Sequence, residues 1–80
     1  MAGEERSQTF DAISVAIGYM LDGQLNEAEQ YGHRAVEMAT VTASVRAADR
    51  LRGLAALATP YKAHSGVAEV VARIGALATG

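Results

Sequence analysis

Glu29, His33 and Glu37 are the residues whose types and spacing come nearest to a chemical site. They are spaced four residues apart, so a helix would place them along one face, where carboxylates and an imidazole could bind a divalent metal ion. Such a site needs a further ligand from elsewhere in the fold, and His64, the other histidine, lies in a predicted connection. We therefore interpret the three residues as a solvated ladder and predict no metal and no cofactor.

The usual ingredients of catalysis are missing from the sequence. There is no cysteine, no glycine-rich phosphate loop and no serine in a nucleophile-elbow context. Tyr31 and His33 are two residues apart, so a helix would turn them to different sides and they would not form an acid–base pair. We predict that the protein is not an enzyme and that it has no catalytic residue.

Arg46 and Arg50 stand four residues apart in a predicted helix. Two arginines at this spacing can follow the phosphates of a nucleic acid or hold the carboxylate of a partner peptide. The chain has a formal net charge of -2, Asp49 interrupts the arginines, and no aromatic platform accompanies them. We expect a solvated face or a carboxylate contact here, and no direct binding of nucleic acid.

Acidic and basic residues are unequally divided along the chain. Acids predominate up to Thr40, whereas arginines and the single lysine, Lys62, predominate after it. An acidic front and a basic back attract each other, either within one molecule or head to tail between copies.

Length and composition describe a small single domain. The chain has 80 residues, of which 50% are hydrophobic, and a core of this size is marginal, so association with another surface is a natural remedy. The absence of cysteine fits a reducing compartment. No apolar run reaches the roughly 18 residues of a membrane span, and no secretion signal is seen. We predict a cytoplasmic protein without a membrane segment.

The apolar residues recur at helical spacing in four segments, which predicts an all-α fold of about four helices in two antiparallel hairpins. We expect a disordered lead-in over residues 1–8 and one helical domain over residues 9–78. The four expected helices cover residues 8–21, the segment from the Asn26 cap to about Thr40, residues 45–59 and residues 67–77.

Individual residues predict how these helices begin, end and cross. Asp22 and Gly23 should stop the first helix, and Asn26 should cap the second. Pro60 should end the third helix, because proline has no amide donor. Gly18 lies inside the first helix at a cost of about 1 kcal/mol relative to alanine, and either a close helix crossing there or chance explains it.

The first hairpin resembles a tetratricopeptide (TPR) repeat, a helical hairpin with small residues at fixed positions. Three positions depart from the motif: Ala12 replaces a tryptophan, Gly32 a bulky residue and Thr40 a proline. The resemblance implies stacked hairpins that bind polypeptides. It is carried by Ala16, Tyr19, Gly23, Ala28 and Ala35.

The second half resembles the C-terminal helical module of bacterial transcription regulators that carry an N-terminal helix-turn-helix domain. The resembling segments read S-V-R-A-A-D-R-L-R-G-L, A-T-P-Y-K and G-V-A-E-V. This resemblance implies a role in transcriptional regulation. A DNA-binding part is not seen, so the sequence leaves open whether the chain is a module of a longer regulator or a small relative.

These observations predict a noncatalytic module that binds a protein or peptide partner or forms a homo-oligomer. The alternative is a small helical bundle in which the many alanines and glycines leave a cavity between the hairpins for a hydrophobic effector. The partner and the oligomeric state stay open. The residues we expect at an interface are Phe10, Ile13, Ile17, Tyr19, Met20, Tyr31, Arg46, Arg50, Tyr61, Val70 and Ile74.

Overall fold

Four α-helices and one short 3₁₀ helix form the described chain in the computed structural model, which describes the backbone of residues 2–79 and the side chains of residues 8–77. The described residues contain no strand, so the predicted all-α class is confirmed. The elements are α1 (Ala2–Leu21), α2 (Leu25–Thr42), α3 (Val45–Ala58), η1 (Thr59–Tyr61) and α4 (Ser65–Thr79).

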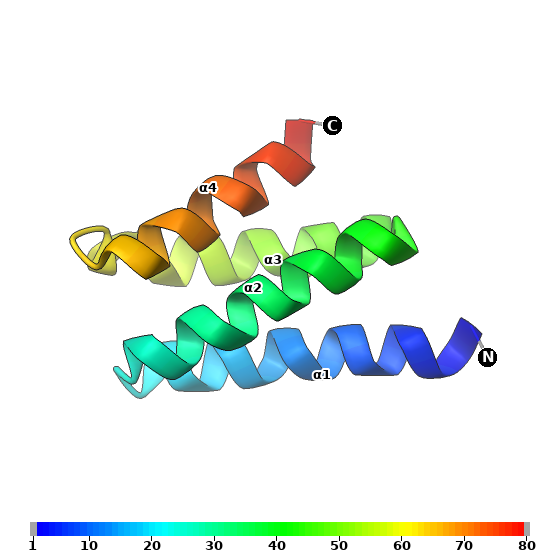
Figure 1. Cartoon of the computed structure of the whole chain (residues 1–80), viewed down its shortest axis with the longest axis horizontal. Coiled ribbons are helices and arrows are strands. Elements are labelled where there is room, and N and C mark those ends of the chain that lie inside the picture. The colour runs from blue at the N-terminus through cyan, green and yellow to red at the C-terminus, as the bar shows by residue number, and fades with distance from the viewer. Residues whose placement is uncertain (1, 80) are drawn as a thin grey trace.

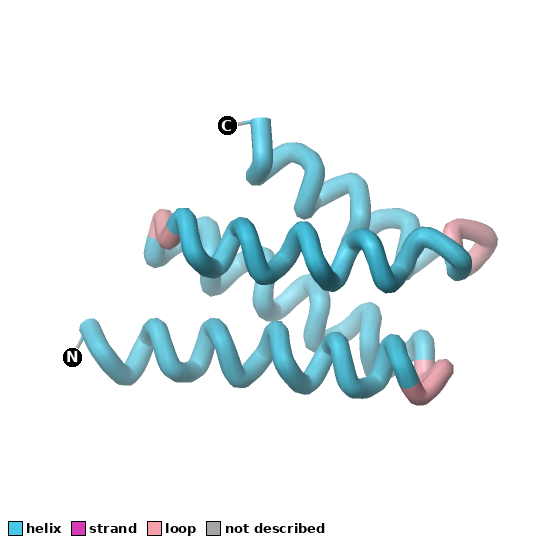
Figure 2. Tube along the Cα trace, turned by 180° about the vertical axis from the view of Figure 1, so that it is seen from behind, coloured by secondary structure: helices cyan, strands magenta, loops and turns pink. Residues whose placement is uncertain are grey.

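The helices lie in two layers. α1 and α3 lie side by side in one layer and run in the same direction, and α2 and α4 form the other layer and run the opposite way (Figures 1 and 2). α1 packs against α2 and α3, and α4 packs against the same two helices. Consecutive helices therefore form two antiparallel pairs, α1–α2 and α3–α4, which bury their facing sides against each other.

Alanine is the commonest residue of the core, which lets the helix backbones approach closely. Only a few large side chains are fully buried, and they come from α1, α3 and α4. The buried apolar residues are Ala12, Ile13, Ala16, Met20, Ala28, Ala35, Val36, Ala39, Ala47, Leu51, Leu54, Ala58, Val67, Val70 and Ile74.

Two glycines mark the contact between α2 and α4. A Cβ atom on Gly32 would lie 2.9 Å from Val70 Cγ1, so α4 occupies the space that a side chain would need. Gly66, in the first turn of α4, lies directly against the Glu29 carboxylate of α2. A Cβ on Gly18 would meet nothing within 4 Å. Among the described residues the close crossing of two helices is therefore at Gly32, and no such crossing is found at Gly18.

α1 begins earlier than the sequence predicted. The helix starts at Ala2, whereas we expected a lead-in over residues 1–8 and a helix from Gln8. Residues 2–7 contain no proline, so no residue in this segment prevents the backbone from being helical. Met1 lies outside the described residues.

The turn between α1 and α2 differs in one detail from its prediction. Gly23 has a φ of 77°, the left-handed conformation expected of the helix stop. Gln24, and not Asn26, occupies the N-cap position of α2, and its side chain makes no capping hydrogen bond. Asn26 lies within the helix, where its Oδ1 is 3.2 Å from His64 Nε2, so it links α2 to the segment before α4.

The later helix ends follow from side-chain caps. Ser44 Oγ accepts a hydrogen bond from Ala47 N at 3.2 Å and caps α3. His64 Nδ1 accepts from Val67 N at 3.2 Å, which lets α4 begin at Ser65 rather than at Val67. Pro60 stands in η1, where α3 has ended as predicted.

Ala43 joins α2 to α3 in a left-handed conformation, with φ 51° and ψ 37°. A residue with a Cβ atom is strained in this region, whereas glycine is not. We expect Ala43→Gly to raise the free energy of unfolding by about 0.5–1 kcal/mol, measured by urea denaturation. Gly23→Ala is the reverse control and should lower it. An unchanged or lower stability of Ala43→Gly would contradict the left-handed assignment.

Candidate interaction surface

A row of adjoining depressions follows the outer seam between α1 and α2, and we call it the α1–α2 groove. There are three depressions. Val15 lines both the first and the middle one, and Gln8 and Met38 line both the middle and the last one, so the row is continuous. Val15, Leu21 and Val41 are 39%, 69% and 81% exposed. The larger apolar residues that line the groove are Val15, Tyr19, Leu21, Tyr31, Met38 and Val41.

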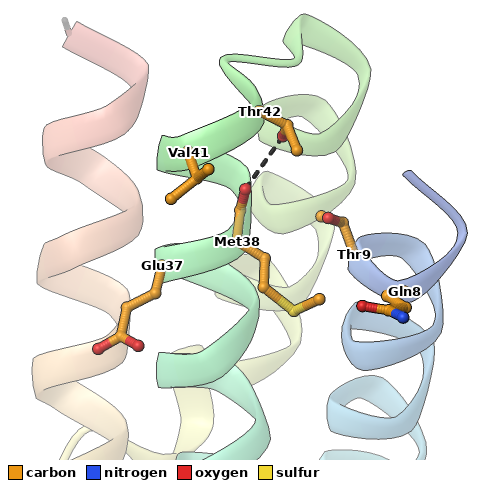
Figure 3. A pocket seen from close by; sticks show the side chains of 6 residues that line it. All are labelled: Gln8, Thr9, Glu37, Met38, Val41 and Thr42. Atoms are coloured by element: carbon orange, nitrogen blue, oxygen red, sulfur yellow. Dashed lines mark hydrogen bonds between the residues drawn. The ribbon is translucent and has the colours of Figure 1, made fainter. Parts of the chain in front are cut away.

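One end of the groove lies beside the last turns of α2 (Figure 3). Met38 extends from α2 towards Thr9 and Gln8 of α1, and the depression between them measures about 260 Å³. Thr42 Oγ1 donates to the Met38 carbonyl oxygen at 3.0 Å, which satisfies the hydroxyl within its own helix. The apolar side chains at this end of the groove are Met38 and Val41, and Gln8, Thr9, Glu37 and Thr42 lie around them.

Two tyrosines stack across the middle of the seam. The rings of Tyr19 and Tyr31 have centroids 5.6 Å apart and planes inclined by 28°. The Arg34 guanidinium carbon lies 5.5 Å from the centroid of the Tyr31 ring, within the range of a cation–π contact. The stacking and the cation–π contact thus stabilise the positions of the two half-buried rings, which line the groove.

The rim of the groove is acidic. Asp11, Asp22 and Glu37 are exposed along it, and Arg34 is its one basic residue. The described side chains contain a single ion pair, Arg52 with Asp49 at 2.9 Å, and both partners belong to α3. The rim carboxylates therefore have no salt bridge to the described arginines of the other helix pair.

α3 presents a different surface, which we call the α3 stripe. Arg46, Arg50, Gly53 and Leu57 are all exposed and follow each other at helical spacing. The Arg50 guanidinium carbon lies 5.5 Å from the centroid of the Phe10 ring. Asp49 pairs with Arg52 and also lines a hollow with Phe10, Arg46 and Arg50, so the three arginines and this one carboxylate carry a net positive charge. The stripe is therefore basic, with an aromatic ring beside it.

The structure separates the predicted interface residues into three groups. Ile13, Met20, Val70 and Ile74 are at most 3% exposed, so their side chains belong to the core and are closed to a partner. Arg46 and Arg50 are exposed on the α3 stripe. The remaining residues pack half-buried against the core: Phe10, Ile17, Tyr19, Tyr31 and Tyr61.

Sequence reasoning missed the most exposed apolar residues. Val41 and Val45 are both 81% exposed, on either side of the turn between α2 and α3. Val45 lies at the first position of α3, beyond the edge of the core. The available signal was the passage T-V-T-A-S-V, which is rich in the β-branched residues that favour strands over helices.

The Glu29, His33 and Glu37 ladder does not converge on a metal site. His33 Nδ1 accepts a hydrogen bond from Arg73 Nη1 at 2.9 Å. The Glu29 carboxylate lies against Gly66. Glu37 lines one end of the α1–α2 groove. Among the described residues no group of three or more potential ligands could hold a metal ion.

Comparisons with protein-family models, with curated proteins and with solved structures give no match for this chain. Both resemblances noted in the sequence therefore stay predictions. Over the described residues, no helix combines the length and the apolar character that crossing a bilayer requires.

Proposed function

We propose that the protein is a noncatalytic module that associates with a second copy of itself through the α1–α2 groove. The observation that carries the proposal is the continuous line of exposed apolar side chains on this seam, from Leu21 through Val15 to Val41. Contiguous exposed apolar surface is uncommon on monomers and marks interaction sites. An 80-residue domain also gains stability from association.

The biological setting is part of the same proposal. The resemblance to the helical module of bacterial regulators supports a cytoplasmic role in transcriptional regulation, in which the module would hold subunits together. The antiparallel helix pairs and their two layers support a TPR-like arrangement.

Replacing Val15 with glutamate tests the groove, because it places a charge among the exposed apolar side chains without entering the core. We expect the wild type to form dimers or larger species and Val15→Glu to stay monomeric at concentrations at least tenfold higher. Solution molar mass, from light scattering coupled to size exclusion, is the measurement. Ile17 is unsuitable for this purpose because it packs against the core.

Ser14→Glu is the matched control, since it adds the same charge to the neighbouring exposed position outside the groove. It should retain the mass of the wild type, and circular dichroism should show equal helicity for all three proteins. A wild type that is monomeric at every concentration, or a Val15→Glu variant with the wild-type mass, would refute the proposal.

A hydrophobic effector remains the second candidate, and one depression favours it. A hollow of about 400 Å³ lies where α2, α3 and α4 meet, lined by small or apolar residues that include Ala39, Ala48 and Leu77. It opens to solvent, so a ligand there would stay partly exposed. Self-association covers more of the exposed apolar residues and is therefore our first choice.

A further inference from the structure

We propose that the copies associate head to tail, with the α3 stripe of one copy lying in the α1–α2 groove of the next. This inference rests on the proposed self-association and adds the identity of the surface that fills the groove. The occupant is then a helix that presents two arginines, a glycine and a leucine to an acidic, apolar seam.

Charge complementarity is the first argument. The described side chains of residues 8–44 are net negative, and those of residues 45–77 are net positive. No ion pair joins these two sets in the described structure. Arg46 and Arg50 on the stripe and Asp11 and Glu37 on the rim are thus available to one another between copies. Complementary charges of this kind orient partners and speed their encounter.

Two glycines give the second argument. Gly53, in the middle of α3, costs about 1 kcal/mol relative to alanine in a helix interior, yet a Cβ there would meet nothing within 4 Å. Gly18, which lines the groove, also faces open space. Nothing within the described chain requires either glycine, whereas helices that cross closely favour small residues at their contact. Leu57, one turn beyond Gly53, supplies an apolar anchor.

A two-fold contact between two grooves fits less well. It would bring the acidic rims of both copies together, with Asp11, Asp22 and Glu37 on each side. Arg34 is the one basic residue of the rim and already lies over the Tyr31 ring. Like charges placed opposite each other disfavour such a contact. A head-to-tail contact avoids this and leaves a free groove and a free stripe at the two ends of every open assembly.

The test combines two variants, each of which blocks one surface. Val15→Glu blocks the groove and keeps the stripe, and the double variant Arg46→Glu/Arg50→Glu blocks the stripe and keeps the groove. We expect each variant alone to be monomeric, and an equimolar mixture to double in molar mass and grow no further. The wild type should instead grow beyond the dimer as its concentration rises, unless its contacts close into a ring.

Lys62→Glu/Ala63→Glu/Ala72→Glu is the matched control, because it makes the net charge more negative by the same amount at exposed positions outside the α3 stripe and the groove. It should keep the wild-type mass, and circular dichroism should show that every variant is folded. If the stripe variant associates like the wild type while Val15→Glu is monomeric, the copies meet through their grooves, and the head-to-tail inference is overturned while the proposed function stands. A monomeric wild type would overturn both.

Discussion

Gly32→Leu is expected to displace α4 from α2 and to leave the domain largely unfolded where the wild type is folded. A Cβ at this position would lie 2.9 Å and 3.2 Å from the two γ-carbons of Val70, and both residues are buried. Overpacking by a few atoms costs about 1–3 kcal/mol, and leucine adds four carbons. A core of this size rarely supplies more than about 3–5 kcal/mol. Far-ultraviolet circular dichroism and thermal denaturation measure the loss.

A graded series separates steric overlap from a general effect of replacing glycine. Gly32→Ala should lower the free energy of unfolding by about 1–3 kcal/mol. Adding Val70→Ala should recover part of this, because the double variant makes room, so the two effects should not add. Gly53→Ala, in open space, should instead stabilise by up to about 1 kcal/mol. A Gly32→Ala variant as stable as the wild type would show that α4 does not approach α2 this closely.

Leu51→Ala is expected to have the next largest effect, a loss of about 2–5 kcal/mol in the free energy of unfolding. Leu51 is 0% exposed in a core made mostly of smaller side chains. Few neighbours are large enough to move into the cavity, which favours the upper part of the range. Urea denaturation, at a concentration where the protein is monomeric, gives the value.

Leu57→Ala provides the matched comparison for Leu51→Ala. It makes the same chemical change on the same helix, but Leu57 is 37% exposed. We expect a loss below about 1 kcal/mol there, because less apolar surface returns to water. Equal losses at the two positions would contradict the inward orientation of Leu51.

The existence of the helices could be predicted from the sequence because the apolar period persists through each of them. The residues at which the helices begin and end could be predicted less well. Asn26 looked like a cap, but its side chain bonds across to His64, and His64 in turn caps α4. Contacts between residues 38 positions apart in sequence are set by packing, and no local pattern announces them.

The candidate site was predicted only in part, for a similar reason. Tyr19 and Tyr31 do line the groove and Arg46 and Arg50 are exposed, whereas Val70 and Ile74 face inward. The spacing of the apolar residues in α4 shows that one face of the helix is apolar, but it does not show whether α2 or a partner covers that face. The answer depends on Gly32, whose missing side chain admits Val70.

The alanine-rich core also affects how the protein responds to temperature. An alanine side chain has no torsion to freeze, so burying it costs no rotamer entropy. It also removes little apolar surface from water, and the heat capacity change of unfolding scales with that surface. The consequence is a shallow stability curve, in which the folded state changes little in free energy over a wide range of temperature and melts gradually.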